Sequence, residues 1–212
     1  FHEANANAQN ALLKTLEEAP PRVVLLLTAD SSESLLPTIV SRCEVLRLRP
    51  MPLDQLVGKL GQCQPDLSPE DARLLAHLAG GRLGYALRLK DNPALMEQRQ
   101  SFISDLREML GANRRDRFAY AESGVKDKEA LRLGYQVWLS FWRDMLLRSV
   151  NPHLPVVNLD FEDLLDNLAP RVGLAQARAR VSDLEKGLAR LDGNLNARLL
   201  TEVILLDWPF IS

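Results

Sequence analysis

Residues 22–47 place a short helical segment between two apolar runs, and this order constrains the fold more than any other stretch of the chain. The run Arg22-Val-Val-Leu-Leu-Leu-Thr28 predicts a buried strand. Residues 34–41 predict a helix with Pro37 in its first turn, where a missing N–H costs little. A second strand is predicted directly after Ser41-Arg42-Cys43. Residues 1–50 therefore predict part of an α/β layer, whose further strands would have to come from elsewhere.

The rest of the chain predicts helices. Ser68-Pro69-Glu-Asp71 has the spacing of a capped helix start, and Gly80-Gly81 predicts its end. Further helices are predicted over 53–60, around Tyr85 and Leu87, and over 93–111, 127–149, 161–168, 172–191 and 199–206. The predicted fold class is mainly α, with the C-terminal remnant of an α/β domain in front.

The helix predicted over 127–149 carries one wide apolar face that includes Tyr135, Trp138 and Trp142. Such a face forms either a domain core or a surface for neighbouring subunits, and the sequence leaves both open. Residues 113–126 are polar and predict a boundary between two helical blocks. We interpret their basic cluster, Arg114, Arg115 and Arg117, as a solvated linker.

Composition excludes several functional classes. The chain has 26 basic and 28 acidic residues, so no overall field favours nucleic acid or an anionic membrane. No apolar run is long enough to cross a bilayer, and we expect no membrane association and a cytoplasmic protein. Cys43 and Cys63 lack the partners of a four-ligand zinc site, so we expect free thiols and no metal.

No Gly-x-x-x-x-Gly-Lys-Ser/Thr stretch occurs, so the sequence contains no glycine loop to hold a triphosphate. We therefore expect no cofactor and no enzymatic activity for this chain. The first residue is Phe1 rather than Met, and the first residues already belong to a polar, alanine-rich helix. We therefore expect a fragment that begins partway through a domain, with any P-loop or zinc module of the parent upstream.

The Ser41-Arg42-Cys43 segment and its flanking strands resemble those of AAA+ clamp-loader subunits. The resemblance continues over Asn10–Pro21, Leu25–Ala29, Leu46–Pro52, Gly81–Leu87 and Leu191–Glu202, and so covers nearly the whole chain. Within that family the chain is most similar to the delta prime type of the bacterial DNA polymerase III. The resemblance implies an incomplete AAA+ ATPase domain over 1–50, a helical lid over 51–111 and a helical collar over 112–212.

The resemblance also implies roles for individual residues. Arg42 would be an arginine finger acting in trans on ATP bound by a neighbour, with Ser41 and Cys43 completing the motif. Thr28 would occupy the sensor 1 position. Gly84 falls where active motors carry the sensor 2 arginine, and Arg82, two residues earlier, points elsewhere on a helix. This departure favours a subunit that does not hydrolyse ATP.

The implied partners are motor subunits of the gamma/tau type and the delta subunit in a five-subunit ring, with the sliding clamp and primed DNA reached through the assembled complex. The parent assembly would be a DNA-directed DNA polymerase complex. Two alternatives stay open at this point. The chain could be a gamma/tau-type motor truncated before its P-loop, or a helical interaction module without a role in replication.

Overall fold

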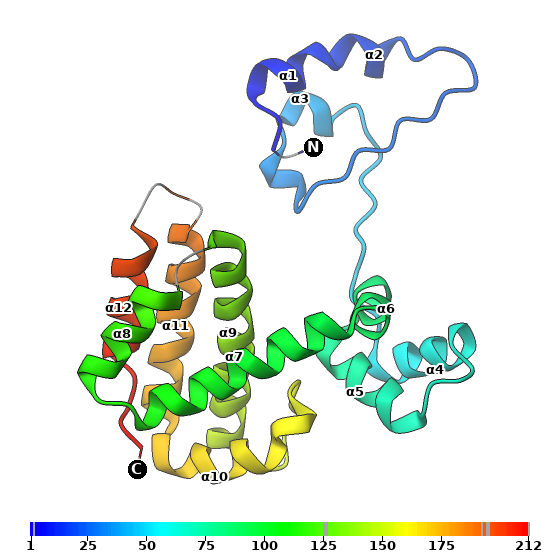
Figure 1. Cartoon of the computed structure of the whole chain (residues 1–212). Coiled ribbons are helices and arrows are strands. Elements are labelled where there is room, and N and C mark those ends of the chain that lie inside the picture. The colour runs from blue at the N-terminus through cyan, green and yellow to red at the C-terminus, as the bar shows by residue number, and fades with distance from the viewer. Residues whose placement is uncertain (2, 125–126, 192, 194–195, 212) are drawn as a thin grey trace. The chain divides into compact units, whose positions relative to one another are not determined.

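The computed structural model describes residues 1, 3–124, 127–191, 193 and 196–211. It divides into two compact units, Phe1–Arg49 (unit 1) and Pro50–Ser212 (unit 2), which are described separately. The predicted fold class is confirmed, because the ordered elements of the described residues are helices (Figure 1).

Unit 1 contains short helices and long extended segments. The helices are α1 (Ala6–Ala11), α2 (Leu13–Glu17), the 3-10 turn η1 (Ser32–Ser34) and α3 (Pro37–Val40). The Asn5 side chain caps α1 by accepting from the Ala8 N–H at 2.9 Å. The buried Gln9 side chain donates to the Ala4 carbonyl and accepts from the Leu36 N–H, both at 3.0 Å. One polar side chain therefore ties α1 to the start of α3.

The prediction of two buried strands in unit 1 is wrong. Residues 23–29 and 44–50 are extended, but within the described part of unit 1 neither forms a strand. Their apolar side chains are exposed, with Val24 at 81%, Leu26 at 84% and Leu48 at 96%. A strand that is apolar on both faces becomes buried only when a sheet surrounds it, and here the two runs are not paired with one another.

Unit 2 begins with a cluster of three helices, α4 (Leu53–Cys63), α5 (Pro69–Ala79) and α6 (Leu83–Asp91). We call the buried core they share the N-terminal cluster; it includes Leu56, Leu60, Leu75, Ala76, Ala86 and Leu89. The predicted start of α5 is confirmed, since Ser68 Oγ accepts from the Asp71 N–H at 3.0 Å. Its end is also confirmed, because Gly80 adopts a left-handed conformation with φ 54°.

Gly81 brings the chain's entry into unit 2 against the turn between α5 and α6. Its carbonyl accepts from the Met51 N–H at 2.8 Å. A Cβ at this position would lie 2.6 Å from Pro50 Cβ and 2.7 Å from the Met51 carbonyl oxygen, and φ is 84°. A side chain is therefore excluded twice, by space and by backbone conformation.

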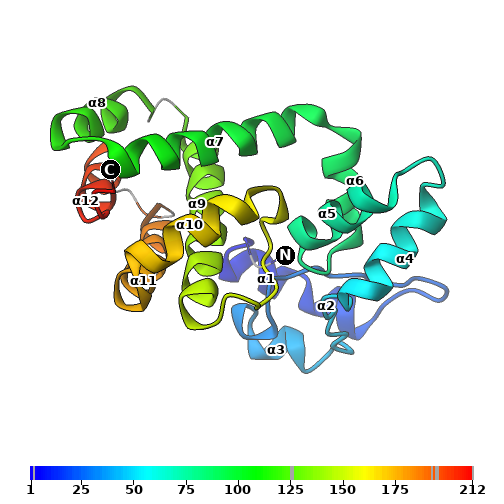
Figure 2. The ribbon, with the colours of Figure 1, turned by 90° about the horizontal axis from the view of Figure 1, so that it is seen from below.

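The helix α7 (Pro93–Gly111) connects the two hydrophobic clusters of unit 2 (Figure 2). Near its start, Leu95 and Met96 pack against the N-terminal cluster. Near its end, Ile103 and Leu106 are buried in the second cluster, which we call the C-terminal cluster.

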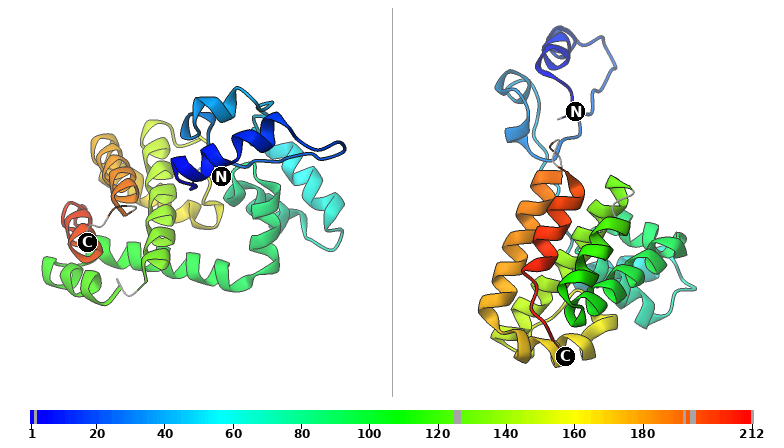
Figure 3. Two further views of the ribbon diagram at one scale, coloured as in Figure 1. Left: turned by 90° about the horizontal axis from the view of Figure 1, so that it is seen from above. Right: turned by 60° about the vertical axis from the view of Figure 1, so that its left-hand side comes forward.

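The C-terminal cluster is formed with α8 (Arg114–Gly124), α9 (Lys128–Val150), the turn η2 (Leu159–Phe161), α10 (Glu162–Val172), α11 (Leu174–Leu191) and α12 (Ala197–Leu206). The helix α11 lies along α9, and α12 lies along α11 and α8 (Figures 1 and 3). The aromatic face of α9 is core: Tyr135, Trp138 and Trp142 are at most 1% exposed. Trp208 packs edge-on against Trp138, with ring centroids 5.0 Å apart.

The interpretation of the basic cluster as a solvated linker is wrong in that the cluster lies on a helix and Arg117 is buried, although Arg114 and Arg115 are exposed. Residues 125 and 126 of the polar segment lie outside the described residues. Residues 114–124 form α8, and the Asn113 side chain caps its start by accepting from the Asp116 N–H at 3.1 Å. Arg117 is 5% exposed and donates to the backbone carbonyls of Met109, Leu205, Trp208 and Pro209. Five fixed N–H groups let one guanidinium satisfy several carbonyls at the ends of α7 and α12, so this arginine is structural.

A buried polar network joins α7, α9 and the loop that precedes η2. Asp144 of α9 accepts from the backbone N–H groups of Val157 and Asn158. Arg99 of α7 donates to Asn158 Oδ1 at 2.7 Å and forms a two-pronged pair with Asp160. We call Arg99, Asp144, Asn158 and Asp160 the Asn158 clasp.

Candidate functional site

The sequence-predicted finger Arg42 lies just after the short helix α3 in unit 1. Pro37 begins the helix after the extended Leu36, and Ile39, which is 0% exposed, anchors it. The Arg42 N–H donates to the Ile39 carbonyl at 3.0 Å, and the Cys43 N–H donates to the Val40 carbonyl at 3.3 Å. These turn contacts fix the backbone from which the guanidinium projects.

The Arg42 guanidinium is partly exposed and has partners within unit 1. Its side chain is 37% exposed. Nε and Nη2 lie 2.6 Å and 2.5 Å from Glu17 Oε1, at the end of α2. Nη1 donates to the Thr38 carbonyl at 3.0 Å and to Ser41 Oγ at 3.3 Å. All three nitrogens are thus engaged locally, and a bidentate contact with another group requires Glu17 to be displaced.

The two flanking motif residues have local roles. The Ser41 hydroxyl donates to the Thr38 carbonyl at 3.1 Å while it accepts from Arg42. Cys43 is half-buried and Cys63 is exposed, and both are free thiols, as predicted. Ser41 therefore supports the guanidinium, and the structure does not involve the Cys43 thiol in that contact.

Thr28, the predicted sensor 1 residue, lies in the extended segment 23–29 and is exposed. Its carbonyl accepts from the amino group of Phe1. Its hydroxyl has no hydrogen-bond partner within the described residues of unit 1. The structure thus gives its side chain no contact with Arg42.

Gly84, at the predicted sensor 2 position, lies in the first turn of α6 in unit 2. A Cβ there would meet no atom within 4 Å, so a larger side chain would face open space. The Arg82 side chain makes local contacts. Its Nε donates to the Ala79 carbonyl at 2.9 Å, and its guanidinium lies over the Tyr85 ring, 5.0 Å from the ring centroid. Arg82 thus stabilises the turn before α6.

The apolar side chains of α12 present a second surface with functional potential. Leu199, Val203 and Leu206 follow one another at helical spacing and are 56%, 56% and 37% exposed. We call these three residues the α12 stripe. The opposite face of the helix is buried through Leu200, Ile204 and Leu205.

Sequence reasoning missed the partner of Arg42. Glu17 is 25 residues away in the chain, and nothing in its local pattern distinguishes it from the neighbouring Glu18. The capping pattern Asn113-x-x-Asp116, in contrast, was a visible signal for α8.

Among the described residues, no three His, Cys, Asp or Glu side chains are placed to hold a metal ion. Within the same part of the chain, no helix is both long and apolar enough to cross a membrane.

Comparison with known proteins identifies relatives of this chain. The protein family described as "DNA polymerase III, delta subunit" matches residues 1–52. The "DNA polymerase III subunit delta'" of Bacillus subtilis is 26% identical over 96% of this chain and 62% of its own length. The subunit of the same name from Pseudomonas aeruginosa is 31% identical over 96% of this chain and 62% of its length. The "DNA polymerase III subunit tau" of Escherichia coli is 33% identical over 52% of this chain and 18% of its length.

The chain is therefore a relative of DNA polymerase III subunits. Within that class it is similar to delta prime subunits along nearly all of its residues, as the sequence predicts, whereas similarity to the tau subunit covers about half of them. The chain spans less than two thirds of the length of these two delta prime subunits.

Proposed function

We propose that this chain acts in a clamp loader of the replicative DNA polymerase as a subunit that does not hydrolyse ATP. It supplies Arg42 to ATP bound by a neighbouring motor subunit while the sliding clamp is loaded on primed DNA. The observation that carries this proposal is the similarity to delta prime subunits over 96% of the chain. The placement of Arg42 on a partly exposed turn supports it.

A guanidinium suits this role because it carries a permanent charge in a planar fork. Such a group neutralises charge that develops on phosphoryl oxygens without giving up a proton. Ser41 and Thr38 hold Nη1 by neutral contacts, so the side chain can keep its direction when Glu17 is displaced.

We infer that residues 1–50 belong to the AAA+ domain, 51–111 to a lid and 112–212 to a collar. The presence of two separate hydrophobic clusters in unit 2 supports the assignment of a lid and a collar. Gly84 in place of a sensor 2 arginine, with Arg82 held in its own turn, supports a subunit without hydrolysis of its own.

The proposed partners are gamma/tau-type motor subunits and the delta subunit in a five-subunit ring. The α12 stripe is the surface that we propose for contact with a neighbouring collar, because three exposed apolar side chains in a row favour association. Val203→Glu is expected to weaken assembly with the other subunits. Leu174→Glu, an equally apolar and 50% exposed position on α11, serves as the matched control.

The central experiment replaces Arg42 in the whole protein and measures ATP hydrolysis by the assembled complex with clamp and primed DNA. Arg42→Ala is expected to slow hydrolysis at the adjacent site by roughly 10³-fold or more, the contribution of arginine fingers elsewhere. Arg42→Lys keeps the positive charge but loses the planar, forked guanidinium, so the complex that carries it is expected to hydrolyse ATP little faster than the Arg42→Ala complex. Arg47→Ala, an exposed arginine of the same unit, is the control. Normal assembly with unchanged hydrolysis in Arg42→Ala would refute the finger.

A gamma/tau-type motor is the second candidate, and the similarity to tau over half of the chain favours it. It predicts that the whole protein binds and hydrolyses ATP without other subunits. Equilibrium binding of labelled ATP to the isolated protein separates the two candidates.

A further inference from the structure

A very short junction connects the helices α4, α5 and α6, which we call the N-terminal bundle, to the rest of unit 2. The helix α6 ends at Asp91 and α7 begins at Pro93, so one non-helical residue, Asn92 (φ −128°, ψ 86°), separates them. Proline at the first helical position favours such a break, because it has no N–H to continue the preceding helix. A junction of this kind can act as a hinge, since hinges are a few residues at the ends of elements.

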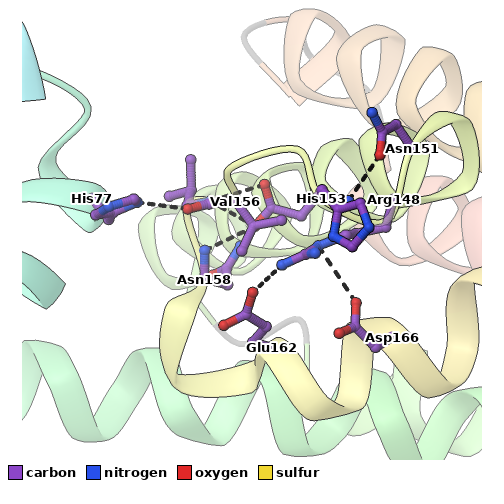
Figure 4. Close-up of polar contacts among 10 residues, drawn as sticks. His77, Arg148, Asn151, His153, Val156, Asn158, Glu162 and Asp166 are labelled. Atoms are coloured by element: carbon purple, nitrogen blue, oxygen red, sulfur yellow. Dashed lines mark hydrogen bonds and ion pairs between the residues drawn. The ribbon is translucent and has the colours of Figure 1, made fainter.

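Residues 156–158, in the segment between α9 and η2, make a second attachment, which we call the strap. The Val156 side chain is 2% exposed in the C-terminal cluster, whereas the next side chain, Val157, packs against the N-terminal cluster. His77 of α5 lies with Nδ1 2.7 Å from the Val156 carbonyl oxygen (Figure 4). Because a carbonyl oxygen only accepts, Nδ1 carries the hydrogen, and this bond fixes the ring against the strap. The strap therefore holds the N-terminal bundle by an apolar contact and a neutral hydrogen bond.

The strap is held more firmly on its other side. The Asn158 clasp binds it to α7 and α9, and within the clasp the Asp144 carboxylate accepts from the N–H groups of Val157 at 3.0 Å and Asn158 at 2.8 Å. Just beyond the strap, Arg148 of α9 is paired with two carboxylates of α10 (Figure 4). Hydrogen bonds to an ionised group are roughly twice as strong as neutral ones. The weaker hold of the strap is therefore the one on the N-terminal bundle.

Open space beside the strap leaves the N-terminal bundle room to move. A cavity of about 880 Å³ lies between α6 and α9, with Tyr85 and Arg88 of α6 on one wall and Leu133 and Gln136 of α9 on the other. Val157 of the strap also lines this cavity. The two walls are thus separated by space rather than by packed side chains, and α6 can approach or leave α9 without first displacing a core.

We propose that the strap is a latch, which holds the N-terminal bundle in one orientation and whose release lets this bundle turn as a body about Asn92. While the latch is closed, a displacement imposed on the N-terminal bundle is passed on to α7 and α9. When it opens, the Val157 packing and the bond between His77 and Val156 are lost, and the cavity between α6 and α9 changes its width. Both hydrophobic clusters stay intact. This inference concerns unit 2 alone and does not depend on the proposed role of Arg42.

The test measures the distance between α4 and α11 in the whole protein by double electron–electron resonance. Spin labels are placed on Cys63 of α4, a natural exposed thiol, and at the exposed position Arg178→Cys of α11, with Cys43→Ser to remove the other thiol. The protein with its natural strap is expected to give one narrow distance distribution. The double variant His77→Leu/Val157→Ser loses both contacts with the N-terminal bundle and is expected to give a broader or shifted one. A broad distribution in the first protein, or an unchanged one in the double variant, overturns the proposal.

The matched control makes the same two changes at exposed positions of the neighbouring chain. It is Val150→Ser/His153→Leu, in which the valine is 64% exposed and the histidine lies outside the strap. This control is expected to keep the narrow distribution, and a change as large as that of the double variant would overturn the proposal.

A second label pair distinguishes a turn of the N-terminal bundle from its melting. Labels on Cys63 and on Arg88→Cys of α6 both lie within that bundle, so their distance is expected to stay the same in the double variant. Broadening of this distance would mean that the bundle melts, and would overturn the latch. Should the double variant not fold, Val157→Ser alone, at a half-buried position, takes its place under the same criteria.

Discussion

Asn158 donates to the Asp144 carboxylate from two groups, its backbone N–H at 2.8 Å and its side-chain Nδ2 at 2.7 Å. Asp144 is 1% exposed and also accepts from the Val157 N–H at 3.0 Å. Since Arg99 of α7 donates to the other end of the same Asn158 amide, the loop before η2 is bound to α9 and α7 at once. The Asn158 clasp therefore fixes this loop through polar contacts rather than apolar packing.

Asp144→Asn is expected to lower the free energy of unfolding by about 1–3 kcal/mol. The new amide nitrogen would place its own N–H groups against the backbone N–H groups of Val157 and Asn158, which now donate to the carboxylate. Urea denaturation measures the change. Asp163→Asn, an exposed acid on α10, is the control and is expected to leave the midpoint unchanged. An equally stable Asp144→Asn protein would show that the carboxylate is not needed in the clasp.

The difference in stability between the unmodified protein and Asp144→Asn is expected to depend on pH. Burial raises the pKa of Asp144, while the hydrogen bonds from Val157 and Asn158 oppose that change. The folded protein then holds the carboxyl proton more tightly than the unfolded chain, so stability falls as the pH rises from below the ordinary carboxyl range to the raised pKa. Asp144→Asn lacks this loss. The stability gap between the two proteins is therefore expected to narrow with rising pH and then to level off.

Tyr135→Phe tests the aromatic core in alkaline solution. The Tyr135 hydroxyl and Thr201 Oγ1 lie 2.7 Å apart, and burial raises the pKa of Tyr135 to about 12. Loss of this bond is expected to cost about 0.5–1.5 kcal/mol at neutral pH. Above the ordinary tyrosine pKa of about 10 the unfolded chain ionises first, so the unmodified protein loses stability up to pH 12 and the phenylalanine variant loses less. Denaturation midpoints at pH 8 and pH 11 measure this convergence.

Arg117→Met is expected to lower the free energy of unfolding by about 2–4 kcal/mol, because several buried carbonyls lose their donor together. The affected carbonyls include those of Leu205 and Trp208 near the C-terminal end of the chain. Thermal unfolding measures the loss. Arg115→Met, on the exposed side of α8, is the matched control, and a similar effect of both substitutions would contradict a structural role for Arg117.

Glu17→Gln tests whether Glu17 restrains Arg42, and it rests on the proposed finger. Exposed ion pairs contribute about 0.2–1 kcal/mol, so release of the guanidinium is expected to raise ATP hydrolysis by the assembled complex up to about fivefold. Glu18→Gln, the adjacent exposed acid, is expected to have no effect. A fall in hydrolysis with Glu17→Gln would mean that Glu17 positions Arg42 for the neighbour instead of restraining it.

Local signals in the sequence predicted much of the helical structure. Ser68 and Asp71 at the start of α5 and Gly80 at its end act within one or two turns, so their chemistry can be read from neighbouring residues. The two apolar runs of unit 1 were read as buried strands for the same local reason, and that prediction failed. Burial of a strand depends on distant neighbours, which a local pattern does not contain.

The candidate sites show the same limit. Arg42 was found from its motif, but its pairing with Glu17 joins residues 25 positions apart. The burial of Arg117 depends on carbonyls about 90 positions away, and the fixed ring of His77 depends on Val156, 79 positions away. Contacts between residues so far apart in the sequence follow from the packing of α5, α8 and α12. Local patterns, such as helix caps and hydrophobic periodicity, do not predict that packing.

The shared helix α7 has a thermodynamic consequence. Leu95 and Met96 pack in one hydrophobic cluster while Ile103 and Leu106 lie in the other, on the same continuous helix. Melting either cluster removes tertiary packing from the helix that both require, and in proteins most of the stability of a helix comes from such packing. Residues 50–212 should consequently lose their structure in one cooperative transition, with heat absorption in a single peak.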